Sequence, residues 1–168
     1  QCILPKDQQS TLKGFWGVTP VPWALSMVDF KGNASEQQVM VSSVGIWNSF
    51  TKVSFGHEIL VQAPVSSTET LSTDLAGVTL STVETFGGCS KKILNDDLTA
   101  FVQPVVLHKV SNWSQVHSGK ENVIALTTQC LVSGSPNFNM AFIELNTQDF
   151  WATGKPQPDL KSIVVHEL

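Results

Sequence analysis

The residues best suited to chemistry stand at the end of the sequence, where an apolar run leads into His166 and Glu167. On a helix, two histidines four residues apart face the same way and can share one zinc ion. A glutamate directly after the first histidine is then placed to take a proton from water beside the metal. This H-E-x-x-H pattern is present here only as far as Leu168. Either the motif continues after Leu168, which would make His166 a candidate metal ligand and Glu167 a candidate base, or the His-Glu pair is accidental.

The other three histidines are weaker candidates for a site. The segment "GHEIL" at residues 56–60 repeats the His-Glu pair, but it lies in an alternating pattern that predicts a strand. Residues four apart in a strand do not converge on one ion, so His57 is expected to be structural or at the surface. His108 and His117 are nine residues apart in a loop-prone region that lacks the His and Asp pattern of a structural zinc site. We expect both of them at the surface.

Two helices are predicted to carry and support the terminal pair. Asp159 follows a proline and is a natural N-cap, which predicts a helix over residues 159–168. Asn33 and Glu36 form a capping arrangement for a longer helix over residues 35–50. Four apolar residues recur in that helix at helical spacing and are expected to face the core. They are Met40, Val44, Trp47 and Phe50.

Strands are predicted before and after the longer helix. The better patterns are residues 23–30, 53–63, 122–132 and 139–147. Residues 98–110 are interrupted by Pro104, which cannot donate a hydrogen bond to a central ladder, so they predict an edge strand. Alternating strand and helix signals without a linker or a repeat favour one mixed α/β domain.

Composition excludes several classes of protein. Hydrophobic residues make up 42% of the 168 residues and charged residues only 14%, against about 25% in an average domain. The net charge is −4, and the ten basic residues are scattered lysines, which argues against nucleic-acid binding. No apolar run approaches the roughly 18 residues that span a bilayer. The low charge suits a secreted protein whose leader has been removed.

The three cysteines leave alternatives open. Cys89 and Cys130 are predicted either to form a disulfide in an oxidising compartment or to be two unrelated buried thiols. Cys2 stands beside the N-terminus and fits a propeptide remnant, a lipid-attachment site on a cell surface or a free thiol.

Two stretches of the chain resemble a known family. The phrases "VPWALSMVDF…SEQQVMVSSVGIWNSFTKVSF" and "AFIELNTQDFW…PDLKSIVVHEL" are similar to the matrixin-like branch of the metzincin zinc endopeptidases. The resemblance implies an α/β fold with a twisted mixed sheet, mostly parallel with an antiparallel edge strand, packed by two main helices. It also implies that residues 1–22 are an N-terminal extension or linker. Residues 23–168 would then be the upper part of a single catalytic domain whose lower part follows Leu168.

The same resemblance implies a function. The parent protein would be a secreted endopeptidase that hydrolyses protein or peptide substrates with zinc as cofactor; calcium has no support in the sequence. His166 would be a zinc ligand and Glu167 the general base and acid, while the second and third ligands would follow Leu168. An edge strand within residues 122–132 or 139–147 would pair with extended substrate. The chain as printed is expected to be inactive alone.

Two other functions remain open from the sequence. The first is a non-catalytic secreted binding or structural α/β domain in which the terminal His-Glu pair is coincidental. The second treats "VHEL" as a retrieval address similar to H-D-E-L. It is the weaker of the two, because the four letters continue an apolar helix. Nothing in the sequence indicates an oligomeric state.

Overall fold

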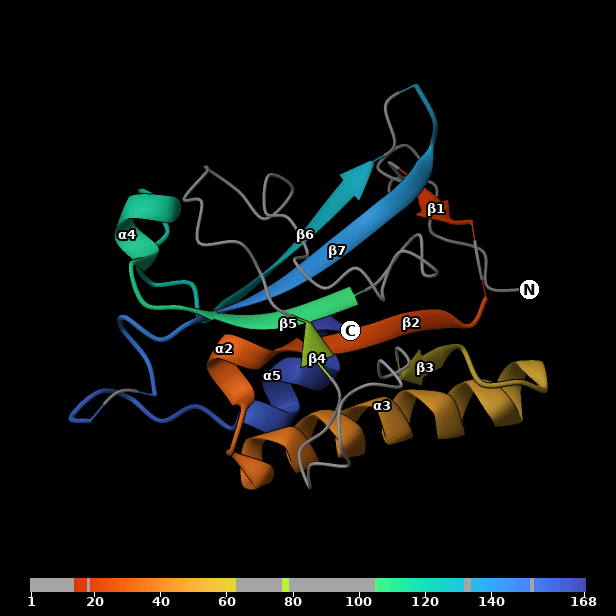
Figure 1. The fold of residues 1–168 in the computed structure, drawn as a ribbon, viewed down its shortest axis with the longest axis horizontal. Helices are drawn as coiled ribbons and strands as arrows, with labels where there is room; N and C mark the ends of the chain where they lie inside the picture. Colours follow the sequence, from red (N-terminus) through yellow and green to blue (C-terminus); the bar gives the residue numbers. More distant parts are fainter. Residues whose placement is uncertain (1–13, 18, 63–76, 79–104, 132–133, 152) are drawn as a thin grey trace.

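The computed structural model describes residues 14–17, 19–62, 77–78, 105–131, 134–151 and 153–168. In chain order the elements are β1 (Phe15–Trp16), β2 (Val21–Ser26), α2 (Met27–Phe30), α3 (Ala34–Phe55), β3 (Leu60–Gln62), β4 (Gly77–Val78), β5 (Val105–Val110), α4 (Trp113–Val116), β6 (Ala125–Leu131), β7 (Asn137–Asn146) and α5 (Leu160–Glu167). Helices α3 and α5 lie on the same side of the sheet (Figure 1).

The described strands form one mixed sheet. Its order is β1-β7-β5-β2-β3, with β4 paired to β2 and β6 paired to β7. The pairing is parallel everywhere except between β6 and β7, which run antiparallel. The expected α/β class, the mostly parallel sheet and the antiparallel edge strand are therefore confirmed. Within the described residues that edge strand is β6, because β7 has neighbours on both sides.

The strand that contains Val105 was expected at an edge, and this prediction was wrong. β5 lies between β2 and β7 in the middle of the sheet. Pro104 comes directly before the first residue of β5, so the ladder loses no donor to the proline. Five of the six β5 residues are buried, as befits a central strand.

Both faces of the sheet are buried along its central strands. Side chains alternate between the two faces of a strand. On the helix side, Leu107 of β5 and Ile143 and Leu145 of β7 pack with Met40 of α3 and Val164 of α5 in the hydrophobic core. The alternate residues of β5 and β7, which point to the other face, are also buried. They are Val106, His108, Val110, Phe142, Glu144 and Asn146.

The longer helix begins where the sequence predicts and ends later. The Asn33 side chain accepts a hydrogen bond from the backbone N–H of Glu36, which fixes the N-terminus of α3. The helix ends at Gly56, whose positive φ of 82° suits a glycine at this end of a helix. Residues 53–55 therefore continue the helix, and the first part of the predicted strand over 53–63 was wrong. The strand itself, β3, is shorter.

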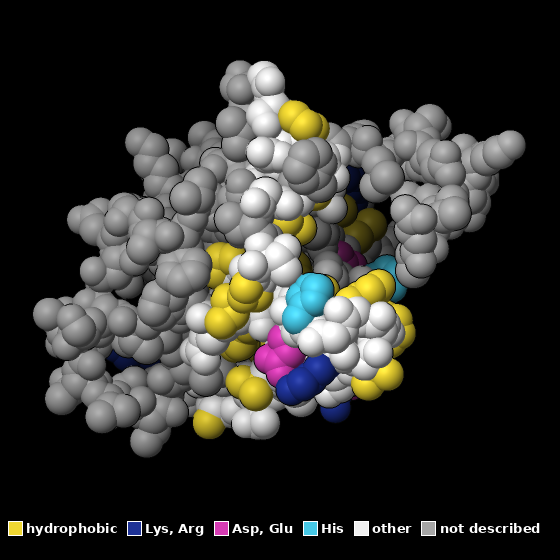
Figure 2. Space-filling model, turned by 90° about the vertical axis from the view of Figure 1, so that its right-hand side faces the viewer, with side chains coloured by type: hydrophobic (Ala, Val, Ile, Leu, Met, Phe, Trp, Pro, Cys, Tyr) yellow, Lys and Arg dark blue, Asp and Glu magenta, His cyan; other side chains and the backbone are white. Residues whose placement is uncertain are grey.

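The predicted apolar stripe of α3 is buried only in its first half. Met40 and Val44 are in the core and Trp47 is half-buried, but the side chain of Phe50 is 56% exposed. Val53 and Phe55 beyond it are exposed as well. Hydrophobic side chains accordingly show on the face drawn in Figure 2, which is the end of the molecule where the C-terminal half of α3 lies. The expectation that Phe50 belongs to the core was wrong.

The Asn48 side chain fastens this half of α3 to the sheet. Its Oδ1 accepts hydrogen bonds from the backbone N–H groups of Ile59 and Leu60, and its Nδ2 donates to the Leu60 carbonyl at 2.8 Å. The start of β3 is thereby held against the helix that precedes it.

Candidate functional site

Helix α5 carries the terminal pair, and its start is capped as predicted. The Asp159 carboxylate accepts hydrogen bonds from the Ser162 hydroxyl and from the Ser162 backbone N–H. Both bonds lower the pKa of Asp159 below its ordinary value, and the bond from the hydroxyl has the larger effect. The capping bonds stabilise the helix fully when the pH is above the ordinary pKa of an aspartate. This stabilisation is lost as the pH falls through the lowered pKa of Asp159, because protonation removes the negative charge of the acceptor.

The last turn of α5 is held by α3. Val164 is fully buried in the core, and Ile163 packs against that core. The Trp47 indole Nε1 donates to the Val165 carbonyl at 2.9 Å, across the interface between α3 and α5. The position of His166 and Glu167 is therefore fixed by tertiary contacts as well as by the helix itself.

The two residues of the terminal pair lie in different surroundings. The side chain of His166 is exposed, and that of Glu167 is half-buried. Glu167 meets the antiparallel edge strand, where the Thr127 hydroxyl of β6 lies 2.5 Å from its Oε2 and 3.1 Å from its carbonyl oxygen. A carboxylate that accepts from a hydroxyl on a strand has a fixed orientation, which a proton-transferring group needs.

Thr127 had not been predicted as part of the site. The sequence does contain a signal, since Thr127 and Thr128 are neighbours in a strand and must point to opposite faces. In the structure Thr127 meets Glu167 on the helix side, while Thr128 donates to Glu144 on the other face. The sequence alone does not tell which of the two threonines faces α5.

The described residues do not complete a metal site by themselves. No group of three or more His, Cys, Asp or Glu side chains in this part of the chain is arranged to hold an ion. His166 fits the role of one ligand, because its ring is exposed at the last turn of α5. A catalytic zinc needs about three protein ligands.

The expectation that His108 and His117 lie at the surface was wrong. Both are buried beside Glu144, whose side chain is fully buried. The His108 Nε2 lies 3.2 Å from one carboxylate oxygen of Glu144, and the His117 Nε2 lies 3.1 Å from the other. The Thr128 hydroxyl donates to the same carboxylate at 3.2 Å. We call these four residues the Glu144 cluster.

Sheet register explains why the Glu144 cluster forms. His108 of β5 is directly paired with Glu144 of β7 in the parallel ladder. The short helix α4 follows β5 and ends at His117, which brings the second imidazole to the carboxylate. The ring centroids of Trp113 and His117 lie 4.4 Å apart. The cluster lies on the face of the sheet opposite α5, so it cannot share an ion with His166.

The remaining sequence candidates have simpler positions. His57 is exposed beyond the end of α3, with its Nδ1 3.1 Å from the Phe55 carbonyl oxygen, so the expectation of a surface or structural residue is confirmed. Cys130 is in a disulfide, which excludes the interpretation as a free buried thiol. Cys2 and Cys89 lie outside the described residues, and the predicted Cys89–Cys130 pairing stays a prediction.

Comparisons with known proteins give no identification. No protein-family model, no curated protein and no solved structure matches the chain. Among the described helices none is both long and apolar enough to cross a membrane, in agreement with the sequence.

Proposed function

We propose that this chain is the upper part of the catalytic domain of a secreted, matrixin-like zinc-dependent endopeptidase. The observation that carries the proposal is the contact between Glu167 and Thr127. It places a carboxylate from the H-E pair of α5 directly against the antiparallel edge strand β6. In the family that the chain resembles, the corresponding His-Glu pair supplies a zinc ligand and the group that transfers the proton.

The edge strand supports the proposal because it offers a place for substrate. An extended peptide can add to an exposed sheet edge through backbone hydrogen bonds, which demand little of its sequence. β6 spans Ala125–Leu131 and pairs with β7 on one side in the described part of the chain. A peptide bound along its other side would pass close to Glu167. The base and the scissile bond would then be neighbours.

The chemistry follows from these positions. When bound, zinc would supply a Lewis acid that polarises the scissile carbonyl and acidifies water to a pKa of about 7. His166 would hold it as one ligand, together with residues that follow Leu168. Glu167 accepts the proton of the attacking water and then donates it to the leaving amine. Thr127 keeps the carboxylate of Glu167 oriented during both transfers.

Secretion is supported by the cysteine chemistry. Disulfides persist in oxidising compartments and are rare in the cytosol of most organisms. Cys130 is in a disulfide. The low content of charged residues, 14%, points the same way.

The proposal is tested by the coding sequence after Leu168 and by the protein that it encodes. We expect a histidine four residues after His166, because that spacing puts both imidazoles on one helix face. The purified extended protein should contain one zinc per chain and cleave an unfolded protein such as casein. A chelator should stop cleavage, and added zinc should restore it. The absence of that histidine, or cleavage that persists without metal, contradicts the proposal.

A Thr127→Val variant tests the orienting role of the hydroxyl. Valine has a similar shape and cannot hydrogen-bond to Glu167, so kcat for a peptide should fall by about tenfold while KM and zinc content stay unchanged. The matched control is Thr128→Val, one residue along β6 on the opposite face, which should leave kcat unaltered. Equal losses of kcat in the two variants would contradict a specific role for Thr127.

A further inference from the structure

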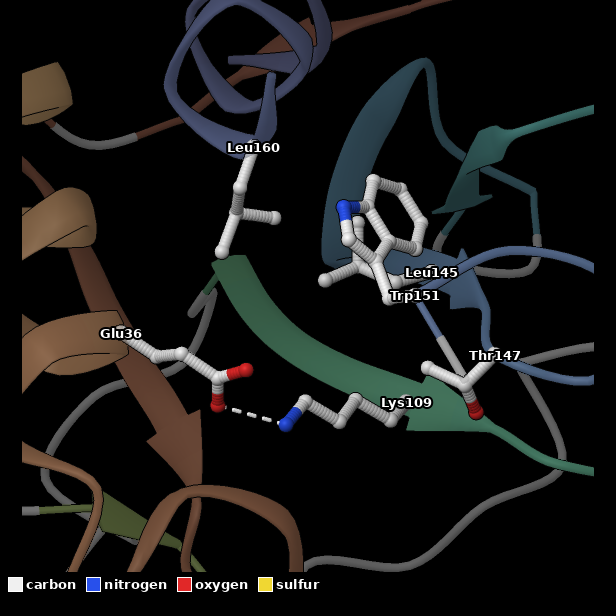
Figure 3. Close-up of a pocket in the computed structure, with 6 residues that line it drawn as sticks. All are labelled: Glu36, Lys109, Leu145, Thr147, Trp151 and Leu160. Atoms are coloured by element: carbon white, nitrogen blue, oxygen red, sulfur yellow. Dashed lines mark hydrogen bonds and ion pairs between the residues drawn. The ribbon is translucent and has the colours of Figure 1, made fainter. Parts of the chain in front are cut away.

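A small pocket opens where two parallel strands end on the helix side of the sheet. Its volume is about 220 Å³. Figure 3 shows its lining, which comes from α3, β5, β7, the segment after β7 and the start of α5. The lining residues are Glu36, Lys109, Leu145, Thr147, Trp151 and Leu160.

The topology of the sheet favours a ligand at this place. β2 and β5 are neighbours in the sheet. After β2 the chain runs through α2 and α3 to β3, which lies on the side of β2 away from β5. After β5 it runs through α4 to β6, which lies beyond β7 on the other side. The connections thus leave the neighbouring strands β2 and β5 in opposite directions. In open α/β sheets, ligands bind outside the carboxyl ends of the strands at such a switch point. Lys109 lies near the carboxyl end of β5, and Glu36 lies in the first turn of α3 after β2.

Two opposite charges are paired with each other on one wall of the pocket. Lys109 Nζ lies 2.5 Å from Glu36 Oε2, and each side chain is about a quarter exposed, at 24% and 26%. The backbone N–H of Lys109 donates to the Asp29 carboxylate, and its Nζ lies 4.8 Å from the ring centroid of Phe30. An ammonium has three donors and a carboxylate two acceptor oxygens, so both groups can bind a further partner while they remain paired.

The opposite wall is apolar and held in place. It consists of Trp151 with Leu145 and Leu160 (Figure 3). Trp151 adopts a positive φ of 58°, which is uncommon for a bulky residue. Its backbone N–H donates to the Pro156 carbonyl and its indole Nε1 to the Pro158 carbonyl at 2.9 Å. The indole is therefore fixed before any ligand arrives.

We propose that this pocket binds a free α-amino acid with an aliphatic side chain of about the size of leucine. Its carboxylate would bind Lys109, its ammonium would bind Glu36, and its side chain would pack on Trp151. An anion without an amino group would be repelled by Glu36, and a cation without a carboxylate would be repelled by Lys109. The volume of about 220 Å³ lies below the roughly 300 Å³ at which pockets for drug-sized ligands begin.

The inference does not depend on the peptidase proposal. Leu160 at this pocket and His166 stand near opposite ends of α5. A chain without any protease activity can still carry the amino-acid site, and a protease can lack it.

Titration of the chain of residues 1–168 with L-leucine, followed by calorimetry and amide NMR shifts, tests the proposal. We expect saturable binding with a Kd of about 1 mM, as suits a ligand of this size. N-acetyl-L-leucine, which lacks the ammonium, and L-leucinamide, which lacks the carboxylate, should each bind about tenfold more weakly or worse.

Variants of the charged pair give the second arm. Lys109→Met and Glu36→Gln should each weaken leucine binding by about tenfold. Lys52→Met and Glu58→Gln are matched controls, because that ion pair is well exposed at 68% and 55% and lies away from the pocket. They should leave the Kd unchanged.

Three outcomes would overturn the proposal. The first is no saturable binding of leucine up to about 20 mM. The second is equal binding of leucine and of either blocked analogue, which would show that only one charge is recognised. The third is an unchanged Kd in a folded Lys109→Met chain. If that variant does not fold, the comparison of the three ligands on the unaltered chain decides the question.

Discussion

A Glu167→Gln variant of the protein extended past Leu168 is expected to keep its zinc and to lose nearly all peptide cleavage. Glutamine has the shape of glutamate, and its amide oxygen can still accept from the Thr127 hydroxyl, which contacts Glu167 at 2.5 Å. The amide cannot take a proton from water at neutral pH. General acid–base catalysis contributes about 10²- to 10⁴-fold, so kcat should fall by that factor. Metal analysis and peptide hydrolysis on the same preparation measure both quantities.

Two further variants separate catalysis from metal binding. His166→Ala should lower the zinc content itself, because it removes a ligand. Glu58→Gln changes an exposed glutamate at a distance from α5 and should alter neither zinc nor rate. A Glu167→Gln protein that cleaves at the rate of the unmodified protein would contradict the assignment of Glu167 as the base. Complete loss of zinc from the Glu167→Gln variant would instead indicate that Glu167 is a zinc ligand.

The features that could be predicted from the sequence are those set by local chemistry. Asn33 and Asp159 cap helices because a short polar side chain reaches the N–H three residues ahead, which is visible in the sequence alone. The antiparallel edge strand and the mostly parallel sheet followed from the family resemblance, and the pairing confirms them. The edge strand β6 also lies within its predicted range, while β7 begins two residues before the predicted strand over residues 139–147.

The features that could not be predicted depend on contacts between distant residues. His108 and His117 looked like surface residues because the partner that buries them, Glu144, comes from another strand. Helix α3 continues to Phe55 although its last turns expose apolar side chains. The left-handed backbone of Gly56 sets the end of α3, so residues 53–55 are helical although their alternating sequence predicts a strand. The contact between Thr127 and Glu167 could not be predicted either, since only tertiary packing decides which face of β6 meets α5.

The second large effect is expected at the Glu144 cluster. Glu144→Ala should lower the free energy of unfolding by about 3–5 kcal/mol, because it leaves a cavity and removes the hydrogen-bond partner of several buried polar side chains. The carboxylate contacts His108, His117 and Thr128, and the truncation takes an acceptor from each of them. For a domain of this size the melting temperature should fall by about 10 °C. Urea and thermal unfolding measure the change.

Two other variants decide whether the effect belongs to the network. Glu58→Ala removes the same side chain from the exposed pair with Lys52 and should cost no more than about 0.5 kcal/mol. Glu144→Gln keeps the shape and one acceptor oxygen, so its loss should lie between those of the two alanine variants. If Glu144→Ala and Glu58→Ala destabilise the chain equally, the buried contacts of Glu144 do not stabilise the fold. The sheet face opposite α5 would then owe its order to apolar packing around Phe142 and Val106, both of which are fully buried.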